Sequence, residues 1–289
     1  MAKITSLPII AGALLACGLS AAPAAALANR TFVSGKGTDA GACAYVAPCR
    51  SFAFALTQTN SGGEIDVLDP AGYGTVTITK AISIVNDGVG LAAIAAPSGN
   101  AITINAGAGN SVHLRGLTID GFGSGSNGIV FATGGNLAIE NCVVRGFTGA
   151  GINIRPTGSA VVTGVFSNVT TNNNLEGIFV SGLFTTGGSV NVTIVDSEAS
   201  NNADNGVEAI SAPGAAATAV MVRNSVASYN GVGLSVGVTG ILRIAHSVVT
   251  GNNSGLNMFV GSIINSYGDN DIDGNTNNNT GVLTVIPTH

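Results

Sequence analysis

The sequence predicts an all-β protein, a right-handed parallel β-helix solenoid of about ten stacked coils. Two observations support this fold class. Short stretches of alternating apolar and polar residues, rich in Val, Ile and Thr, run through most of the chain. A Gly followed by Ile, Val or Leu also recurs along the C-terminal half, at similar but unequal spacings. These pairs are Gly128-Ile129, Gly151-Ile152, Gly177-Ile178, Gly206-Val207, Gly233-Leu234, Gly255-Leu256 and Gly281-Val282.

The composition suits a chain with a large apolar core and few charges. Of its 289 residues, 9% are charged and 45% are hydrophobic, whereas a typical soluble domain has roughly 25% charged residues. This hydrophobicity indicates a folded chain rather than a disordered one. The net charge of −5, the 5% aromatic content and the lack of a basic patch argue against nucleic-acid binding.

Residues 1–28 are predicted to be a signal peptide, so we expect a secreted or periplasmic protein. Lys3 precedes an apolar run at residues 7–15, and Ala26-Leu27-Ala28 forms a small-residue cleavage site. The apolar run is shorter than the roughly 20 residues that a membrane span needs, and no later stretch is long enough either.

A second interpretation of the N-terminus is a lipid anchor. Leu14-Leu15-Ala16-Cys17 resembles a lipobox, in which Cys17 would carry the lipid. The Ala26-Leu27-Ala28 site is the better match, so cleavage that leaves Asn29 first is the main expectation.

Residues 29–63 are predicted to form an N-terminal cap, and residues 64–289 the β-helix. Cys43 and Cys49 flank Pro48 at a separation of six, so we expect them to form a disulfide in an exported chain. Residues 50–56 are predicted to form the one helix, of about two turns. A cap is expected because an uncovered solenoid end exposes apolar surface. Cys142 is expected to be buried and free.

The repeating units predict three short strands per coil, joined by turns rich in Asn and Gly. In the first coils the strands are expected at residues 75–78, 82–84, 101–104 and 117–119. Later turns such as residues 171–174 carry runs of Asn. Coils stacked about 4.8 Å apart pair their strands with the coils above and below, and we expect the Asn side chains to hydrogen-bond from coil to coil. A β-sandwich is the alternative, but it would not repeat the same residue types in one position.

In each Gly-apolar pair the apolar residue is expected to point inward and the next residue outward. The first four inward residues are Ile129, Ile152, Ile178 and Val207. The outward residues form a mostly neutral face and are Val130, Asn153, Phe179, Glu208, Ser235, Asn257 and Leu283.

Charge gathers at one place on this face. Arg155, Glu176, Asp204 and Glu208 fall on three successive coils, so they are the candidate catalytic residues. Carboxylates beside an arginine suit Ca²⁺ and a uronate, or an acid and base across a glycosidic bond. The alternative interpretation is a set of solvated surface charges. His113 is expected to be an exposed strand or turn residue, and Glu140 to form surface salt bridges.

Several segments resemble the pectate-lyase-like superfamily of right-handed parallel β-helix proteins. They are residues 50–56, 76–84 and 112–121, together with the Gly-apolar pairs. The resemblance implies the fold and covers roughly residues 30–289. The superfamily includes pectate lyases, polygalacturonases, epimerases, adhesins and phage tail-spikes, so the fold does not fix the activity. The polygalacturonase strings Asn-Thr-Asp, Asp-Asp, Gly-His-Gly and Arg-Ile-Lys are absent.

Three functions therefore compete. The neutral face favours a non-catalytic envelope or extracellular protein that binds a polysaccharide or cell-surface glycan and needs no cofactor. The charged group favours a polysaccharide lyase, hydrolase or epimerase acting on an anionic polysaccharide, with Ca²⁺ as its cofactor. An adhesin-like structural module is the third.

Overall fold

The computed structural model describes residue 2, residues 27–279 and residues 281–287 of the chain. The predicted signal peptide and the lipobox at Cys17 therefore lie almost wholly outside the described residues. Within the described part, no helix is long and apolar enough to cross a membrane.

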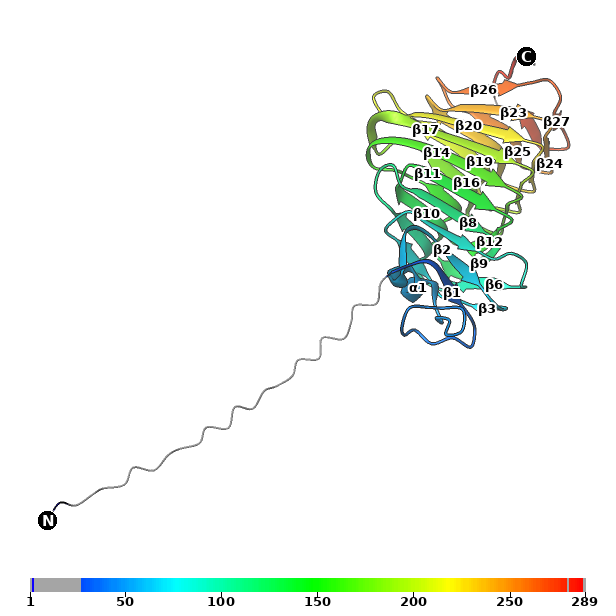
Figure 1. Ribbon diagram of the computed structural model, residues 1–289. Helices are drawn as coiled ribbons and strands as arrows, with labels where there is room; N and C mark the ends of the chain where they lie inside the picture. The colour runs from blue at the N-terminus through cyan, green and yellow to red at the C-terminus, as the bar shows by residue number, and fades with distance from the viewer. Residues whose placement is uncertain (1, 3–26, 280, 288–289) are drawn as a thin grey trace.

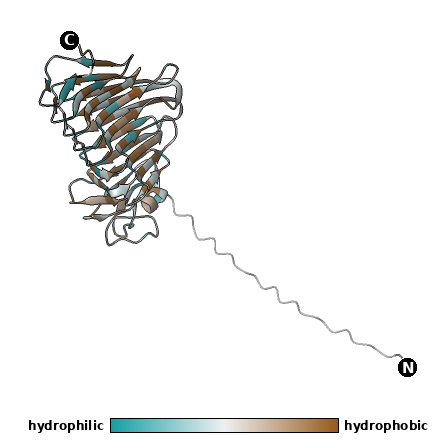
Figure 2. Ribbon diagram, turned by 180° about the vertical axis from the view of Figure 1, so that it is seen from behind, coloured by the Kyte–Doolittle hydropathy of each residue, from teal (hydrophilic) through white to brown (hydrophobic). Residues whose placement is uncertain are grey.

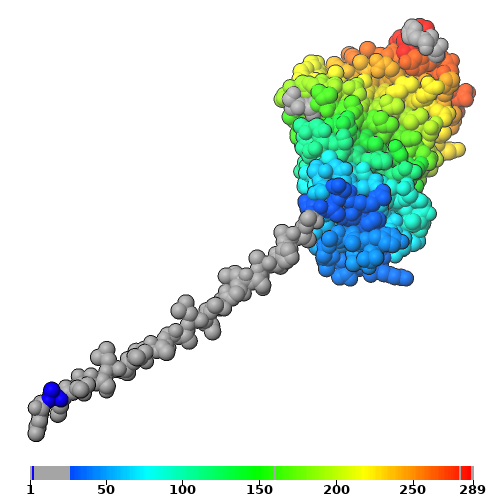
Figure 3. Space-filling model, in the orientation of Figure 1, coloured from blue at the N-terminus to red at the C-terminus, as the bar shows by residue number. Residues whose placement is uncertain are grey.

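The described chain winds through three parallel β-sheets of 11, nine and nine strands, which confirms the predicted parallel β-helix. From β2 onward, strands three apart in chain order lie side by side, so each coil contributes one strand to each sheet (Figure 1). Figure 3 shows the coils stacked in chain order from the N-terminal cap to the last coil.

We name the sheets by the order in which each coil meets them. The first sheet contains β1 (Ala28–Val33), β2 (Thr59–Val67), β5 (Ile82–Val85), β8 (Ser111–Arg115), β11 (Asn136–Glu140), β14 (Gly158–Ser167), β17 (Thr185–Val195), β20 (Ala217–Arg223), β23 (Ile241–Ala245), β26 (Ile263–Ser266) and β29 (Thr284–Val285). The second sheet contains β3 (Ala71–Gly72), β6 (Ala92–Ala95), β9 (Leu117–Gly125), β12 (Val143–Phe147), β15 (Thr170–Asn172), β18 (Glu198–Ser200), β21 (Val226–Ser228), β24 (Val248–Thr250) and β27 (Asp271–Ile272). The third sheet contains β4 (Val76–Ile78), β7 (Asn100–Asn105), β10 (Asn127–Thr133), β13 (Ala150–Ile154), β16 (Glu176–Ser181), β19 (Asn205–Ser211), β22 (Val232–Val238), β25 (Ser254–Met258) and β28 (Asn277–Asn279).

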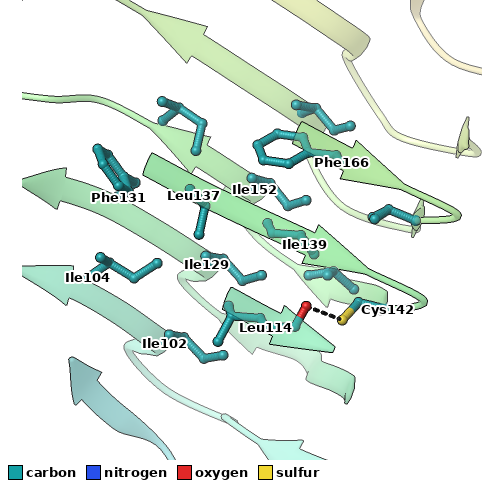
Figure 4. Close-up of a cluster of buried hydrophobic side chains, with 14 of the residues drawn as sticks. Ile102, Ile104, Leu114, Ile129, Phe131, Leu137, Ile139, Cys142, Ile152 and Phe166 are labelled. Carbon is teal, nitrogen blue, oxygen red and sulfur yellow. Dashed lines mark hydrogen bonds between the residues drawn. The ribbon is translucent and has the colours of Figure 1, made fainter. Parts of the chain in front are cut away.

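The core lies inside the coils and is built from stacked apolar side chains. Ile129, Ile152, Ile178 and Val207 are at most 2% exposed, and each is in register with the next one along the stack. Figure 4 shows such side chains from successive coils packed over one another. The predicted inward positions are therefore correct, and like residues bury one continuous core.

The predicted outward positions are half-buried, with the exception of Ser235. Leu283, which follows the last strand of the third sheet, is half-buried, whereas Val282 before it is 87% exposed, so the last pair does not follow the inward pattern. Ser235 is only 1% exposed, so its expected exposure was wrong. Its small side chain lies between those of Glu208 and Asn257, which occupy the same position on the two neighbouring strands. Closely spaced strands let longer neighbours cover a short side chain.

An asparagine ladder links five coils at the turn between the second and third sheets. Each side-chain amide donates to the Oδ1 of the next asparagine, with N–O distances of 3.1, 3.0, 3.0 and 2.9 Å. The ladder residues are Asn174, Asn202, Asn230, Asn252 and Asn275. Figure 2 shows hydrophilic residues concentrated along one edge of the stack. Because the buried amides are paired, the turn avoids the cost of unsatisfied polar groups.

The N-terminal segment closes one end of the stack. The predicted Cys43–Cys49 disulfide is present, and β1 adds a strand to the first sheet beside β2. The one helix of the described residues is α1 (Phe52–Gln58), close to the predicted position. Ser51 caps it, because its side chain accepts a hydrogen bond from the Phe54 amide at 3.2 Å.

Cys142 is free and buried, as predicted. Its Sγ donates to the Leu114 carbonyl oxygen at 3.8 Å (Figure 4). Burial raises the pKa of this thiol to about 11, so it carries little thiolate and is chemically inert at neutral pH.

Two neighbouring positions on β17 test the inward and outward register. Val190 is fully buried and Asn191 is exposed. We expect Val190→Asp to lower the free energy of unfolding by about 4 kcal/mol or more, because it buries an unpaired charge. Asn191→Asp should change it by less than about 0.5 kcal/mol. Urea unfolding measures both, and equal losses in the two variants would refute this register.

Removal of the disulfide should weaken the cap. The bond closes a loop between cysteines with a sequence separation of 6. We expect the double variant Cys43→Ala/Cys49→Ala to lose about 2 kcal/mol of unfolding free energy, since the open loop gains entropy in the unfolded chain. Denaturant unfolding gives the value, and peptide mapping of the non-reduced wild type checks the pairing. A bridge to Cys142 would contradict this assignment.

Candidate functional site

The third sheet brings three of the four predicted site residues together. Glu176 begins β16, Asp204 lies just before β19, and Glu208 lies within β19. Pairing of Phe179 with Glu208 sets the two strands side by side, so Glu176 aligns with Asn205. The carboxyl groups of Glu176 and Glu208 share a hydrogen bond, and the Asn205 amide donates to Glu208 Oε2 at 3.2 Å.

Burial and mutual repulsion allow this carboxyl pair to hold a proton. Burial raises the pKa of Glu208 to about 7, and the negative charges of Glu176 and Asp204 add to this effect. The pKa of Glu176 is also raised, first by burial and then by Asp204. Two carboxyl groups of this kind hold one proton between them near neutral pH, so the pair can act as a general acid or base.

Arg155 does not join the carboxylates in an ion pair. Its guanidinium lies over the ring of Phe184, with 3.8 Å between the Arg155 Cζ and the ring centroid. None of the ion pairs formed by the described residues includes Arg155. The expected group therefore divides into a carboxyl cluster and an Arg155–Phe184 stack. No sequence pattern singles out Phe184, which belongs to the following coil.

The carboxyl cluster lacks the form of a metal site. A calcium ion needs several oxygen ligands around one point. Over residues 27–279 and 281–287, no three His, Cys, Asp or Glu side chains are placed so that they could hold a metal ion. The expected role of Glu176, Asp204 and Glu208 as a joint Ca²⁺ site therefore has no preformed geometry in this structure.

The outer face of the first sheet carries a groove that the sequence analysis did not identify. It has a volume of about 410 Å³ and crosses β5, β8, β11 and β14. Ala138 and Val165 contribute apolar surface. The polar side chains that line the groove are those of Ser83, Ser111, His113, Asn136 and Thr163.

Hydrogen bonds already order part of this groove. The Asn136 amide donates to Ser111 Oγ at 3.0 Å, and the Thr163 hydroxyl donates to Asn136 Oδ1. These three residues occupy the same position on three successive strands. The groove therefore presents a row of fixed polar side chains that runs across the coils.

Two side chains of β8, those of His113 and Arg115, lie close to carboxylate groups. His113 Nε2 lies 3.5 Å from Glu140 Oε2, and Arg115 lies 3.3 Å from an Asp87 oxygen. Ser83, His113 and Ala138 occupy the same position on three successive strands of the first sheet. An alignment of these strands in the sequence would therefore have indicated that the three residues line one groove.

A second carboxyl pair lies at the N-terminal end of the first sheet. Arg30 forms ion pairs with Glu64 and Asp66, the latter at 2.9 Å. Burial raises the pKa of Asp66 to about 6, with a further contribution from Glu64. The positive charge of Arg30 offsets part of the repulsion between Glu64 and Asp66. Among the ion pairs of the described residues, none gives Glu176 or Glu208 such a cationic partner.

Comparison with known proteins finds a similar fold but no similar sequence. No protein-family model and no curated protein sequence matches the chain. Its structure is similar to that of pectate lyase Pel9A, with a TM-score of 0.62 and 18% identity over 89% of this chain and 67% of the lyase. It is also matched to the A-module of the Azotobacter vinelandii mannuronan C-5 epimerase AlgE4, with a TM-score of 0.36 and 16% identity over 78% of this chain and 89% of the module. The protein thus shares the parallel β-helix fold of the pectate lyase, and at this identity the likeness is one of fold alone.

Proposed function

We propose that the protein is an exported glycan-binding protein whose first-sheet groove holds a run of sugar units. The observation that carries this proposal is the groove of about 410 Å³ that crosses four successive coils. The predicted signal peptide and the Cys43–Cys49 disulfide support export to an oxidising compartment. The similarity to a protein named as a pectate lyase supports a polysaccharide as the ligand.

The lining of the groove suits a sugar ring. Ala138 and Val165 offer apolar surface on which the C–H face of a pyranose can lie. The Ser111, Asn136 and Thr163 side chains offer hydroxyl and amide groups to the ring hydroxyls. Apolar surface combined with a few fixed polar groups is typical of small-molecule sites.

The repeat of the protein also suits a repeating ligand. A glycan laid along the stack meets an equivalent strand position about every 4.8 Å. Each contact is weak, but successive sugar units make several contacts at once, and this multivalency raises the affinity. A polymer is therefore a better ligand for this surface than a single sugar.

Substitutions in the groove test this function. A glycan array with the wild-type protein identifies the ligand, and calorimetry then compares variants. We expect His113→Ala and Asn136→Ala each to weaken binding at least tenfold, about 1.4 kcal/mol, because both line the groove. Thr118→Ala is the matched control, since Thr118 is an outward residue of the second sheet a few positions along the same coil. Equal affinity of all three variants and the wild type would place binding elsewhere.

A second candidate function is the cleavage or epimerisation of an anionic polysaccharide. The shared proton of Glu176 and Glu208 favours it, because one carboxyl can donate a proton while the other accepts one. In this proposal Asp204 keeps the pair protonated near neutral pH, and Arg155 binds a carboxylate of the substrate.

Turnover assays distinguish binding from catalysis. If the protein is an enzyme, Glu208→Gln should abolish product formation from pectate or alginate, since the amide cannot exchange the proton. Glu198→Gln is the control, because Glu198 is exposed on the second sheet. Wild-type protein that releases no shortened, unsaturated or epimerised product, with or without Ca²⁺, would eliminate the enzymatic candidate and leave the binding function.

The raised pKa of Glu208 predicts how stability depends on pH. Its pKa in the folded protein, about 7, exceeds the ordinary value of 4.5, so the native state binds the proton more tightly than the unfolded chain. The stability from this group is complete below pH 4.5 and is lost as the pH rises through 7. Glu208→Gln should remove this loss and be more stable than wild type at pH 8, on the order of 1 kcal/mol after solvent screening. Urea unfolding at pH 5 and pH 8 measures the difference, and identical pH slopes would contradict it.

A further inference from the structure

A second groove lies at the N-terminal end of the third sheet, where helix α1 contacts the terminal strand β4. Its volume is about 420 Å³, and Ala53, Leu56 and Thr57 of the helix form one wall. The opposite wall comes from β4, β7 and the segment after β4. This groove lies on a different sheet from the first-sheet groove, and the two share no lining residue.

The strand alternation turns a set of hydroxyl groups into this groove. Val76 and Ile78 point into the core, so Thr75, Thr77 and Thr79 project outward and are exposed. Thr103 on β7 is in register with Thr77, which extends the hydroxyl surface to a second coil. Each hydroxyl can donate one hydrogen bond and accept others, as a sugar hydroxyl does.

Lys80 adds a positive charge to the hydroxyl groups. It lines the groove, and its ammonium donates to the carbonyl oxygen of Thr59, the C-cap residue of α1. An ammonium has three donor hydrogens, so this contact leaves two for another partner. No ion pair among the described residues includes Lys80.

The electrostatic state of Lys80 favours an anion. Partial burial lowers the pKa of its ammonium, because water is withdrawn and no carboxylate replaces it. A ligand with a negative charge would supply the missing partner and would favour the charged form of Lys80.

We propose that this groove binds an anionic sugar unit, with Lys80 paired to its carboxylate or sulfate and the threonine hydroxyls bound to its ring hydroxyls. The ligand class is thus an acidic oligosaccharide. A bare inorganic anion would use Lys80 but would leave the threonine surface without a partner.

Residue-resolved titration tests the proposal. Backbone ¹⁵N–¹H NMR of the full mature chain is recorded with trigalacturonate, its methyl ester, a sulfated disaccharide and inorganic sulfate. Lys80→Gln removes the charge, Lys80→Arg retains it, and Thr77→Val removes one hydroxyl without changing Lys80. Lys36→Gln is the matched control, because Lys36 is the other lysine within the described ranges and is exposed outside the groove.

We expect an acidic sugar, either trigalacturonate or the sulfated disaccharide, to shift the amide signals of residues 75–80 and 103. Binding should weaken at least tenfold in Lys80→Gln, several-fold in Thr77→Val, and not at all in Lys36→Gln or Lys80→Arg. If trigalacturonate is the sugar that binds, its neutral methyl ester should bind at least tenfold more weakly. Whichever acidic sugar binds more tightly identifies the charged group.

Three results would overturn the proposal. These are unchanged affinity in a folded Lys80→Gln variant, inorganic sulfate binding as tightly as the sugars, or shifts confined to other residues. Shifts at His113 and Asn136 alone would support the first-sheet groove and reject this one, so the two proposals can fail separately.

Discussion

The structure depends on the pairing of each strand with the strand at the same position one coil away. The strands of one coil lie in three different sheets, so their backbone groups find their partners in the coils above and below. This requirement stacks equivalent residues into columns. Ile129, Ile152 and Ile178 form one column inside, and the asparagine ladder from Asn174 to Asn275 forms another at the turn. The in-register pairing of strands thus stacks apolar side chains in the core and amide side chains at the turn.

The same constraint creates the candidate sites. Glu208 lies beside Phe179 and near Glu176 because the strands are in register, although the two glutamates belong to different coils. Burial raises the pKa of both carboxyl groups, and the negative charge of Asp204 adds to this effect in each. In the first-sheet groove, the column of Ser111, Asn136 and Thr163 is polar, and it is ordered by hydrogen bonds before any ligand binds. The candidate sites of this protein are therefore columns of side chains across coils rather than short local motifs.

The cap adds a feature that the repeat alone cannot supply. Helix α1 and the disulfide loop cover the first coils, and burial of Phe52 and Leu56 fixes the helix on the end of the stack. The helix also gives the terminal strand β4 a wall on one side, which turns a row of exposed threonines into a groove beside Lys80. The helix that covers the hydrophobic end thus also forms one wall of this groove.

The sequence by itself determined the fold, the inward register, the disulfide and the asparagine ladder. These features either repeat along the chain or depend on nearby residues. The inward position of Ile152 and the turn position of Asn202 can therefore be predicted from the sequence around each residue. The sequence also predicted that Glu176, Asp204 and Glu208 lie together, as they do. It did not determine the other meetings of outward side chains, and only the tertiary structure placed Arg155 over Phe184, covered Ser235 and gathered His113 with Asn136 and Glu140. The reason is that the Gly-apolar pairs recur at unequal intervals, so sequence spacing does not state the cross-coil neighbour. The inward pattern tolerates this variation because any apolar side chain fits the core, whereas an outward site depends on one particular register and on the loops that surround it.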